Sequence, residues 1–132
     1  MTKREMIVTA IESLGYRANV DDDGDVCVRY QMKDIYFLVG QEEEQYVSVL
    51  LPRFSEVHEG EETITLAVCN IMNREMKLAK VYLDPTLKNV IASGDFFYTD
   101  MDSLADNVQH VLNILGLVRS AYNKTKAELT DN

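Results

Sequence analysis

The chain has 132 residues and a formal net charge of −9 at pH 7, and 46% of its residues are hydrophobic. The length predicts a single domain with its own core. The acidic charge argues against nucleic acid and anionic membranes as partners, because both attract basic side chains.

The first predicted element is a helix that begins after Thr2. Thr2 and Glu5 form a capping box, and apolar residues recur at helical spacing up to Leu14, before the helix stop at Gly15. This amphipathic start lacks the apolar core of a signal peptide, so we expect a cytoplasmic protein. The two cysteines of the chain, Cys27 and Cys69, have no paired spacing, and we expect both to be free thiols.

Strand patterns fill the next part of the chain. A tight turn is predicted at Asp21–Gly24, where Asp-Gly suits a hairpin. Pro52 has no N–H to donate to a ladder, so we expect the last strand to end near it. Short turns between neighbouring strands favour an antiparallel meander. The expected strands are Tyr16–Val20, Asp25–Gln31, Ile35–Val39 and Tyr46–Leu51.

Glu62–Lys77 is predicted to be a helix that is apolar on two sides. One face, with Ile64, Ala67, Val68 and Ile71, is expected to cover the sheet. Helices apolar on both sides are usually buried on both sides, so we predict that a second subunit or another partner covers the other side. The residues of that predicted interface are Leu66, Cys69, Asn70, Met72, Asn73 and Met76.

Asn70 and Asn73 within this helix have two interpretations, since Asn is a weak helix former. Either they are partly exposed or bonded to the Lys77–Lys80 connection, or they fix the register of a helix-to-helix dimer. The spacing alone leaves both interpretations open.

A second hairpin and a long helix complete the pattern. The hairpin arms, Leu78–Asp84 and Val90–Tyr98, flank a turn, and Ser93-Gly94 indicates a bulge or a close backbone approach. The helix begins after Thr99 or Asp100 and is expected to extend to about Lys126, with a frayed tail at Thr130–Asn132. Its core stripe is Leu104, Val108, Val111, Leu115, Val118 and Tyr122, widened by Ile114, Leu117 and Ala121.

The order helix, three or four strands, helix, two strands, helix predicts an α+β fold with a twisted antiparallel sheet. The ordered core is expected to cover about residues 2–126.

No motif for chemistry stands out. Asn19–Val26 resembles a calcium loop, but position twelve is Tyr30 and a strand follows, so a hairpin turn is preferred. His58 and His110 lack a partner at ligand spacing. We therefore predict no catalytic residue, no cofactor and no metal site.

Several segments resemble the YbjN family, described as bacterial sensory-transduction regulators. The resemblance is carried by Asn70-Ile-Met-Asn73, Leu78–Asp84, Gly15-Tyr16, Asp23–Val26 and the long helix after Asp100. It implies a fold similar to type III secretion chaperones, which commonly dimerise around the central helix and bind secreted proteins. It implies no catalytic residue.

The leading hypothesis is a non-enzymatic protein-binding module that acts as a homodimer in a chaperone-like or regulatory role. Ile35, Phe37 and Val39, on a strand apolar on both sides, form a further candidate partner surface. The alternative is a small-ligand sensor, and an enzyme is the weakest hypothesis, because no acid–base pair is evident. The sensor pocket would be lined by Tyr30, Tyr36, Tyr82 and Phe96.

Overall fold

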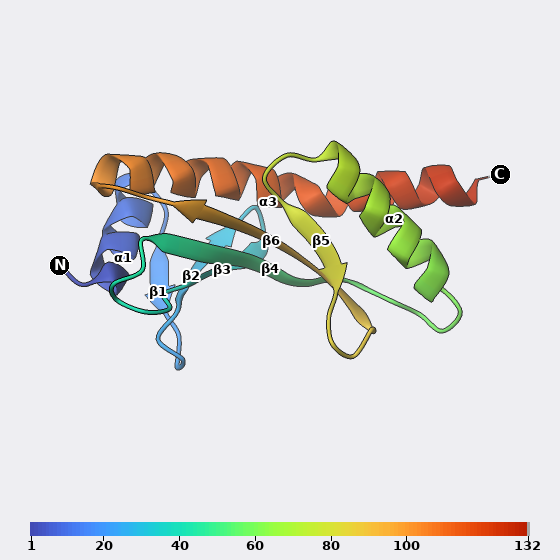
Figure 1. Ribbon diagram of the computed structural model, residues 1–132, viewed down its shortest axis with the longest axis horizontal. Coiled ribbons are helices and arrows are strands. Elements are labelled where there is room, and N and C mark those ends of the chain that lie inside the picture. The colour runs from blue at the N-terminus through green and yellow to red at the C-terminus, as the bar shows by residue number, and fades with distance from the viewer. Residues whose placement is uncertain (132) are drawn as a thin grey trace.

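A six-stranded antiparallel sheet and three helices make up residues 1–131, the part of the chain that the computed structural model describes. The predicted α+β class and element order are confirmed, with four strands before the central helix (Figure 1). The elements are α1 Lys3–Ser13, β1 Ala18–Val20, β2 Val26–Tyr30, β3 Lys33–Leu38, β4 Tyr46–Glu56, α2 Glu62–Glu75, β5 Lys80–Leu83, β6 Asn89–Phe97 and α3 Met101–Thr130.

The strands lie in the order β1-β2-β3-β4-β6-β5. The first four strands form the predicted meander. The chain then leaves the sheet, forms α2 and returns through β5, and β6 pairs with both β4 and β5. The edges of the sheet are therefore β1 and β5, and β4 and β6 lie side by side in its interior.

β4 does not end near Pro52 as expected but continues to Glu56. The register with β6 shifts between Leu51 and Ser55, where Pro52 lacks an N–H and Arg53 has φ +48°. Beyond this irregularity Ser55 pairs with Val90. The proline interrupts the ladder, but pairing with β6 resumes beyond it because β6 is long enough to reach it.

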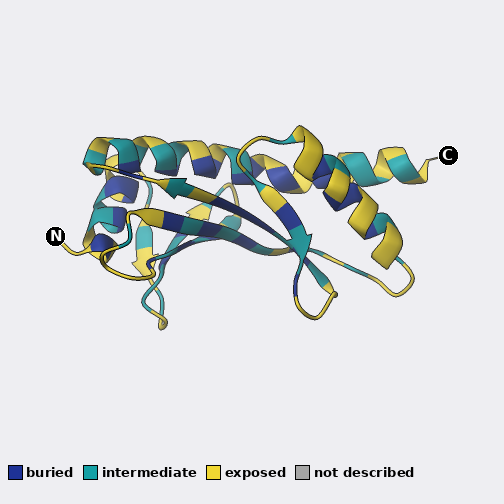
Figure 2. Ribbon diagram, in the orientation of Figure 1, coloured by how far each residue is buried: buried dark blue, intermediate teal, exposed yellow. Residues whose placement is uncertain are grey.

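The strands bury alternate residues, because successive side chains point to opposite faces. Along β4 and β6, buried residues alternate in part with more accessible ones (Figure 2). We define the buried face as Val26, Val28, Ile35, Phe37, Val47, Val49, Leu51, Ala92 and Gly94, which share one side by register. We define the open face as the residues on the other side, of which Ser93 is only 3% exposed: Tyr36, Leu38, Tyr46, Ser48, Leu50, Lys80, Tyr82, Ile91, Ser93, Asp95 and Phe97.

α3 covers the buried face at very close range. A Cβ placed on Gly94 would lie 2.9 Å from Val111 Cγ2, and one on Gly116 would lie 2.8 Å from Tyr30 Cε2. Ser93-Gly94 therefore marks a close approach of backbone and helix, one of the two alternatives predicted for it. The register irregularity lies on β4.

α3 is longer than expected and ends at Thr130, a length of about 45 Å for its 30 residues. Asp100 caps it, and Asp100 and Ser103 exchange side-chain and backbone hydrogen bonds. The predicted core stripe is buried, but Leu117 is 63% exposed, and Leu112 is buried instead. Asp131 follows as the C-cap; Asn132, the end of the tail predicted to fray, lies outside the described residues.

α1 has the predicted capping box between Thr2 and Glu5. The backbone N–H of Lys3 also donates to both carboxylate oxygens of Glu42, at 3.0 and 2.9 Å. The negative charge near the helix N-terminus complements its dipole. Glu42, which lies in the acidic connection between β3 and β4, thus has a structural role.

Candidate partner-binding surfaces

α2 packs against α3 and β5 (Figure 1). Thr65, Val68, Cys69 and Met72 form its buried side. Of the predicted covering face, Val68 is buried and Ile64 packs partly buried against the core, whereas Ile71 is intermediate and Ala67 is exposed. Apolar residues surround this helix, so periodicity could not tell which side faces α3 and which faces solvent.

The predicted α2 interface is divided by this packing. Cys69 and Met72 are only 5% and 2% exposed within a single chain. They have almost no surface left for a partner, so their predicted place in the interface was wrong. Leu66 is 56% exposed and Asn70 is exposed, whereas Met76 is half-buried against the core. The surface that remains for a partner is centred on Leu66.

Asn73 pairs with the edge of the sheet. Its side-chain amide donates to the Val81 carbonyl oxygen at 2.9 Å, and its Oδ1 accepts from the Val81 N–H at 2.7 Å. These two bonds occupy the outer hydrogen-bonding groups of Val81, since its neighbours on β6 are on the other side. Of the two interpretations of Asn73, this geometry is close to the one in which the side chain bonds to the Lys77–Lys80 connection. The actual partner, Val81, is one residue beyond Lys80.

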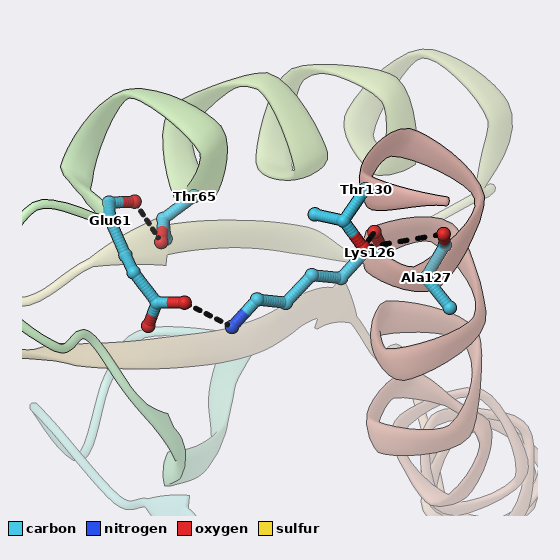
Figure 3. Close-up of polar contacts among 5 residues, drawn as sticks. All are labelled: Glu61, Thr65, Lys126, Ala127 and Thr130. Atoms are coloured by element: carbon cyan, nitrogen blue, oxygen red, sulfur yellow. Dashed lines mark hydrogen bonds and ion pairs between the residues drawn. The ribbon is translucent and has the colours of Figure 1, made fainter. Parts of the chain in front are cut away.

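The start of α2 is joined to the last turns of α3. Lys126 reaches from α3 to the carboxylate of Glu61, the N-cap residue of α2, with Nζ 3.2 Å from Oε2 (Figure 3). The hydrogen bond from Lys126 lowers the pKa of Glu61. Thr65 donates to the Glu61 carbonyl oxygen at 2.7 Å. These contacts hold α2 in place and leave the Leu66 side accessible.

The prediction that Ile35, Phe37 and Val39 form a partner surface needs to be corrected. Ile35 and Phe37 have no exposed surface and Val39 is 7% exposed, so all three belong to the core. Tyr36 and Leu38 point the other way and are partly exposed. A strand apolar on both faces does not reveal which face turns inward, and a one-residue error reverses the assignment.

The open face is a candidate functional feature that the sequence interpretation missed. Tyr36, Leu50 and Ser93 follow one another across three neighbouring strands. Tyr46 and Phe97 are also paired, with ring centroids 6.2 Å apart, and Phe97 is 78% exposed. A usable signal was the polar Ser48 that alternates with Val47 and Val49 and so marks the outward side of β4.

The four aromatic residues of the predicted ligand pocket do not meet. By register Tyr36 and Tyr82 lie on the open face, and Tyr30 and Phe96 lie on the opposite side. Tyr30 donates to Asn113 Oδ1 at 3.1 Å, and Phe96 borders a hollow of about 110 Å³. This hollow is smaller than the usual 300–1,000 Å³ of a ligand site.

The acidic residues of the hairpin Asp21–Asp25 bind backbone groups. Asp21 Oδ1 accepts from the N–H groups of Asp23 and Asp25, both at 2.9 Å, and Asp25 Oδ1 accepts from the Val39 N–H at 3.0 Å. The predicted hairpin is confirmed. Within residues 1–131, no group of three His, Cys, Asp or Glu side chains is placed to hold a metal ion.

The two thiols are poorly suited to nucleophilic chemistry. Burial raises the pKa of the Cys69 thiol to about 11. Burial and then the nearby Asp34 raise the pKa of Cys27. Reactive cysteines need a lowered pKa, so neither residue has the required surroundings. None of the helices in the described chain has the length and apolar character needed to cross a bilayer.

Comparison with solved structures places this arrangement in a known fold class, that of type III secretion chaperones. The ExsC–ExsE complex matches with a TM-score of 0.53 at 9% identity, over 83% of this chain and 85% of the other. The ExoU–SpcU complex from the type III secretion system of Pseudomonas aeruginosa matches with a TM-score of 0.51 at 17% identity, over 86% and 93%. At these identities the likeness shows the fold alone.

The chain belongs to the YbjN family, whose model, described as "Putative bacterial sensory transduction regulator", matches residues 3–117. The crystal structure of YbjN from E. coli, titled a "putative transcription regulator", has a TM-score of 0.69 at 10% identity, over 95% of this chain and 92% of that one. No curated protein sequence matches the chain. The resemblance noted in the sequence is thereby confirmed.

Proposed function

We propose that this protein is a non-enzymatic protein-binding module with a chaperone-like or regulatory role. The observation that carries the proposal is the open face, where aromatic and aliphatic side chains lie partly or largely exposed across β3, β4, β6 and β5. Exposed apolar residues gathered on one face commonly mark interaction sites, and here the Lys80–Asp95 ion pair lies among them.

The fold supports the same proposal. Two solved structures that share it, ExsC–ExsE and ExoU–SpcU, are by their titles complexes of two different proteins. A family described as regulators of sensory transduction also fits a protein that acts by binding another protein. The two free cysteines fit a reducing cytoplasm as the place of action.

A pull-down from the source cells tests partner binding on the open face. Wild type and Phe97→Asp are tagged and compared by mass spectrometry, with Leu87→Asp as a control because Leu87 is similarly exposed, at 57%, but lies in the β5–β6 turn. We expect a specific protein that is retained by the control and lost in Phe97→Asp. Equal recovery with all three proteins would show that the open face does not bind the partner.

We further propose that the protein is a homodimer joined through the exposed side of α2, with Leu66 at its centre. Leu66→Asp is expected to leave a folded but monomeric protein, because a buried unpaired carboxylate is unfavourable at an interface. Sedimentation of both proteins at equal concentration measures this. A wild type that sediments as a monomer, or a Leu66→Asp variant that still sediments as a dimer, would disprove this interface.

The alternative function, a small-ligand sensor, has less support, because its four proposed aromatic residues lie on two sides of the sheet. A thermal-shift screen of nucleotides, amino acids and sugars tests it, since ligands that bind the native state raise the melting temperature.

A further inference from the structure

A group of basic residues lies where β3, β4 and α3 meet. Lys33, Arg53 and Arg119, which we call the basic notch, border a hollow of about 310 Å³. A second hollow of about 500 Å³ shares Lys33 and Arg119 and also includes Ser120 and Asn123. Together they form one open depression that begins at the β2–β3 turn and continues along α3.

The charge of the notch is opposite to that of the whole chain. The protein carries −9, yet the sequence has no Asp or Glu between Asp106 and Glu128, the stretch of α3 that holds Arg119. The one carboxylate that borders either hollow belongs to Asp34, 3.2 Å from Arg29. Within residues 1–131, neither Arg53 nor Arg119 has a carboxylate partner within 4.0 Å.

Three residues with left-handed backbone conformations lie at the same place. Gln31, Met32 and Arg53 have φ values of 49°, 65° and 48°, in the left-handed region that residues with a Cβ avoid. Met32 borders both hollows, Arg53 borders the first and Gln31 the second. Gln31 and Met32 form the two-residue β2–β3 turn, where positive φ at both positions is the usual type I′ hairpin geometry. At Arg53 the cause is different, because a strand irregularity redirects side chains. Here the irregularity of β4 places Arg53 at the notch.

The shape of the notch determines which occupant suits it. Small-molecule sites are mostly enclosed and apolar, whereas this depression is open and has charged and amide side chains beside apolar ones. Guanidinium groups form paired hydrogen bonds with carboxylates. Met32, 86% exposed at the rim, offers a flexible apolar contact beside the charges. These features match an extended peptide that carries both acidic and apolar side chains.

We infer that the basic notch binds an acidic segment of a partner protein, with Arg53 and Arg119 pairing with its carboxylates. This inference rests on the proposed protein-binding function and adds the chemistry of the segment that is recognised. The notch adjoins the open face at Tyr36, which borders the first hollow, but its charged groups are mainly basic.

Fluorescence anisotropy with a labelled peptide tests the inference on the full chain. The probe is a fluorescein-labelled peptide of alternating Glu and Ala with one central Leu, and its Lys-for-Glu analogue serves as the charge control. We expect saturable binding that weakens with salt. Arg53→Gln/Arg119→Gln should weaken binding about tenfold or more, since charge-assisted hydrogen bonds are lost. Arg17→Gln/Arg74→Gln makes the same change in net charge elsewhere and should retain wild-type affinity.

Circular dichroism first establishes that both double variants are folded. Equal weakening in both would reduce the effect to net charge and overturn the inference, as would an absence of saturable binding to wild type. Displacement of the peptide by equimolar inorganic phosphate would identify a small-anion site and also overturn it. If Arg53→Gln/Arg119→Gln abolishes self-association in sedimentation, the occupant of the notch is a second copy of this chain. That result would overturn the inference of a different partner protein.

The pull-down separates this inference from the proposed function. A partner that is captured equally by wild type and Arg53→Gln/Arg119→Gln would refute the notch and leave protein binding on the open face intact. A partner lost only in the notch variant would support the notch as the recognition site.

Discussion

The two faces of the sheet are built from the same strands and contain similar apolar residues, but they differ in what covers them. On β3, Phe37 has no exposed surface, whereas its neighbours Tyr36 and Leu38 are partly exposed. On β6, Gly94 lies against Val111 of α3, and Ser93 beside it points to the open face. Hydrophobicity alone therefore does not define the core of this protein; the close approach of α3 does.

The largest expected difference between the faces is at Phe37 and Leu38. Phe37→Ala should lower the free energy of unfolding by about 3–5 kcal/mol, because it leaves a cavity in the core. Leu38→Ala should lower it by about 1 kcal/mol, since that side chain is already partly exposed. Urea denaturation of both variants measures this. Equal losses would mean that the open face is covered, as by tight dimerisation.

The next effect is expected at the edge of the sheet. Asn73→Ala should cost about 1–3 kcal/mol, because it leaves the N–H and the carbonyl of Val81 without their partner. Asn70→Ala, at an exposed position of the same helix, should change stability by less than about 0.5 kcal/mol. Hydrogen exchange at the Val81 amide gives a local readout. Unchanged exchange in Asn73→Ala would contradict the pairing.

A third pair of variants compares the two faces at adjacent residues of β6. Gly94→Ala should destabilise the protein by about 1–2 kcal/mol, because its Cβ would lie 2.9 Å from Val111 Cγ2. Ser93→Ala should be neutral or slightly stabilising, because Ser93 Oγ is buried without a hydrogen-bond partner in the described chain. Thermal unfolding separates the two. A stable Gly94→Ala protein would show that α3 can shift away from the sheet.

The smallest expected effect lies outside both faces, in the β5–β6 turn. Hydrogen bonds from Thr86 and Asn89 lower the pKa of Asp84 to about 2. A lowered folded-state pKa stabilises the native state above the unfolded value of about 3.9, and this contribution is lost as the pH falls toward 2. The stability difference between wild type and Asp84→Asn should therefore shrink from pH 4 to pH 2 in urea titrations. A constant difference would exclude this carboxylate as the cause.

Local signals in the sequence determined most of the elements. The capping box at Thr2 and Glu5 and the Asp-Gly turn before β2 depend on contacts within a few residues, and both were predicted correctly. The repeating apolar residues of α3 were also predicted, except that Leu112 and not Leu117 is buried. The class of the fold followed from the order of these elements, and the YbjN resemblance followed from short segments such as Asn70-Ile-Met-Asn73.

Only the tertiary structure decided which apolar surfaces are buried. Cys69 and Met72 of α2, and Ile35 and Phe37 of β3, were predicted to meet a partner, but α3 and the sheet of the same chain cover them. The basic notch likewise unites Lys33, Arg53 and Arg119 from three distant segments. Periodicity shows that a helix or strand has an apolar side, but what covers that side depends on contacts between residues far apart in the chain.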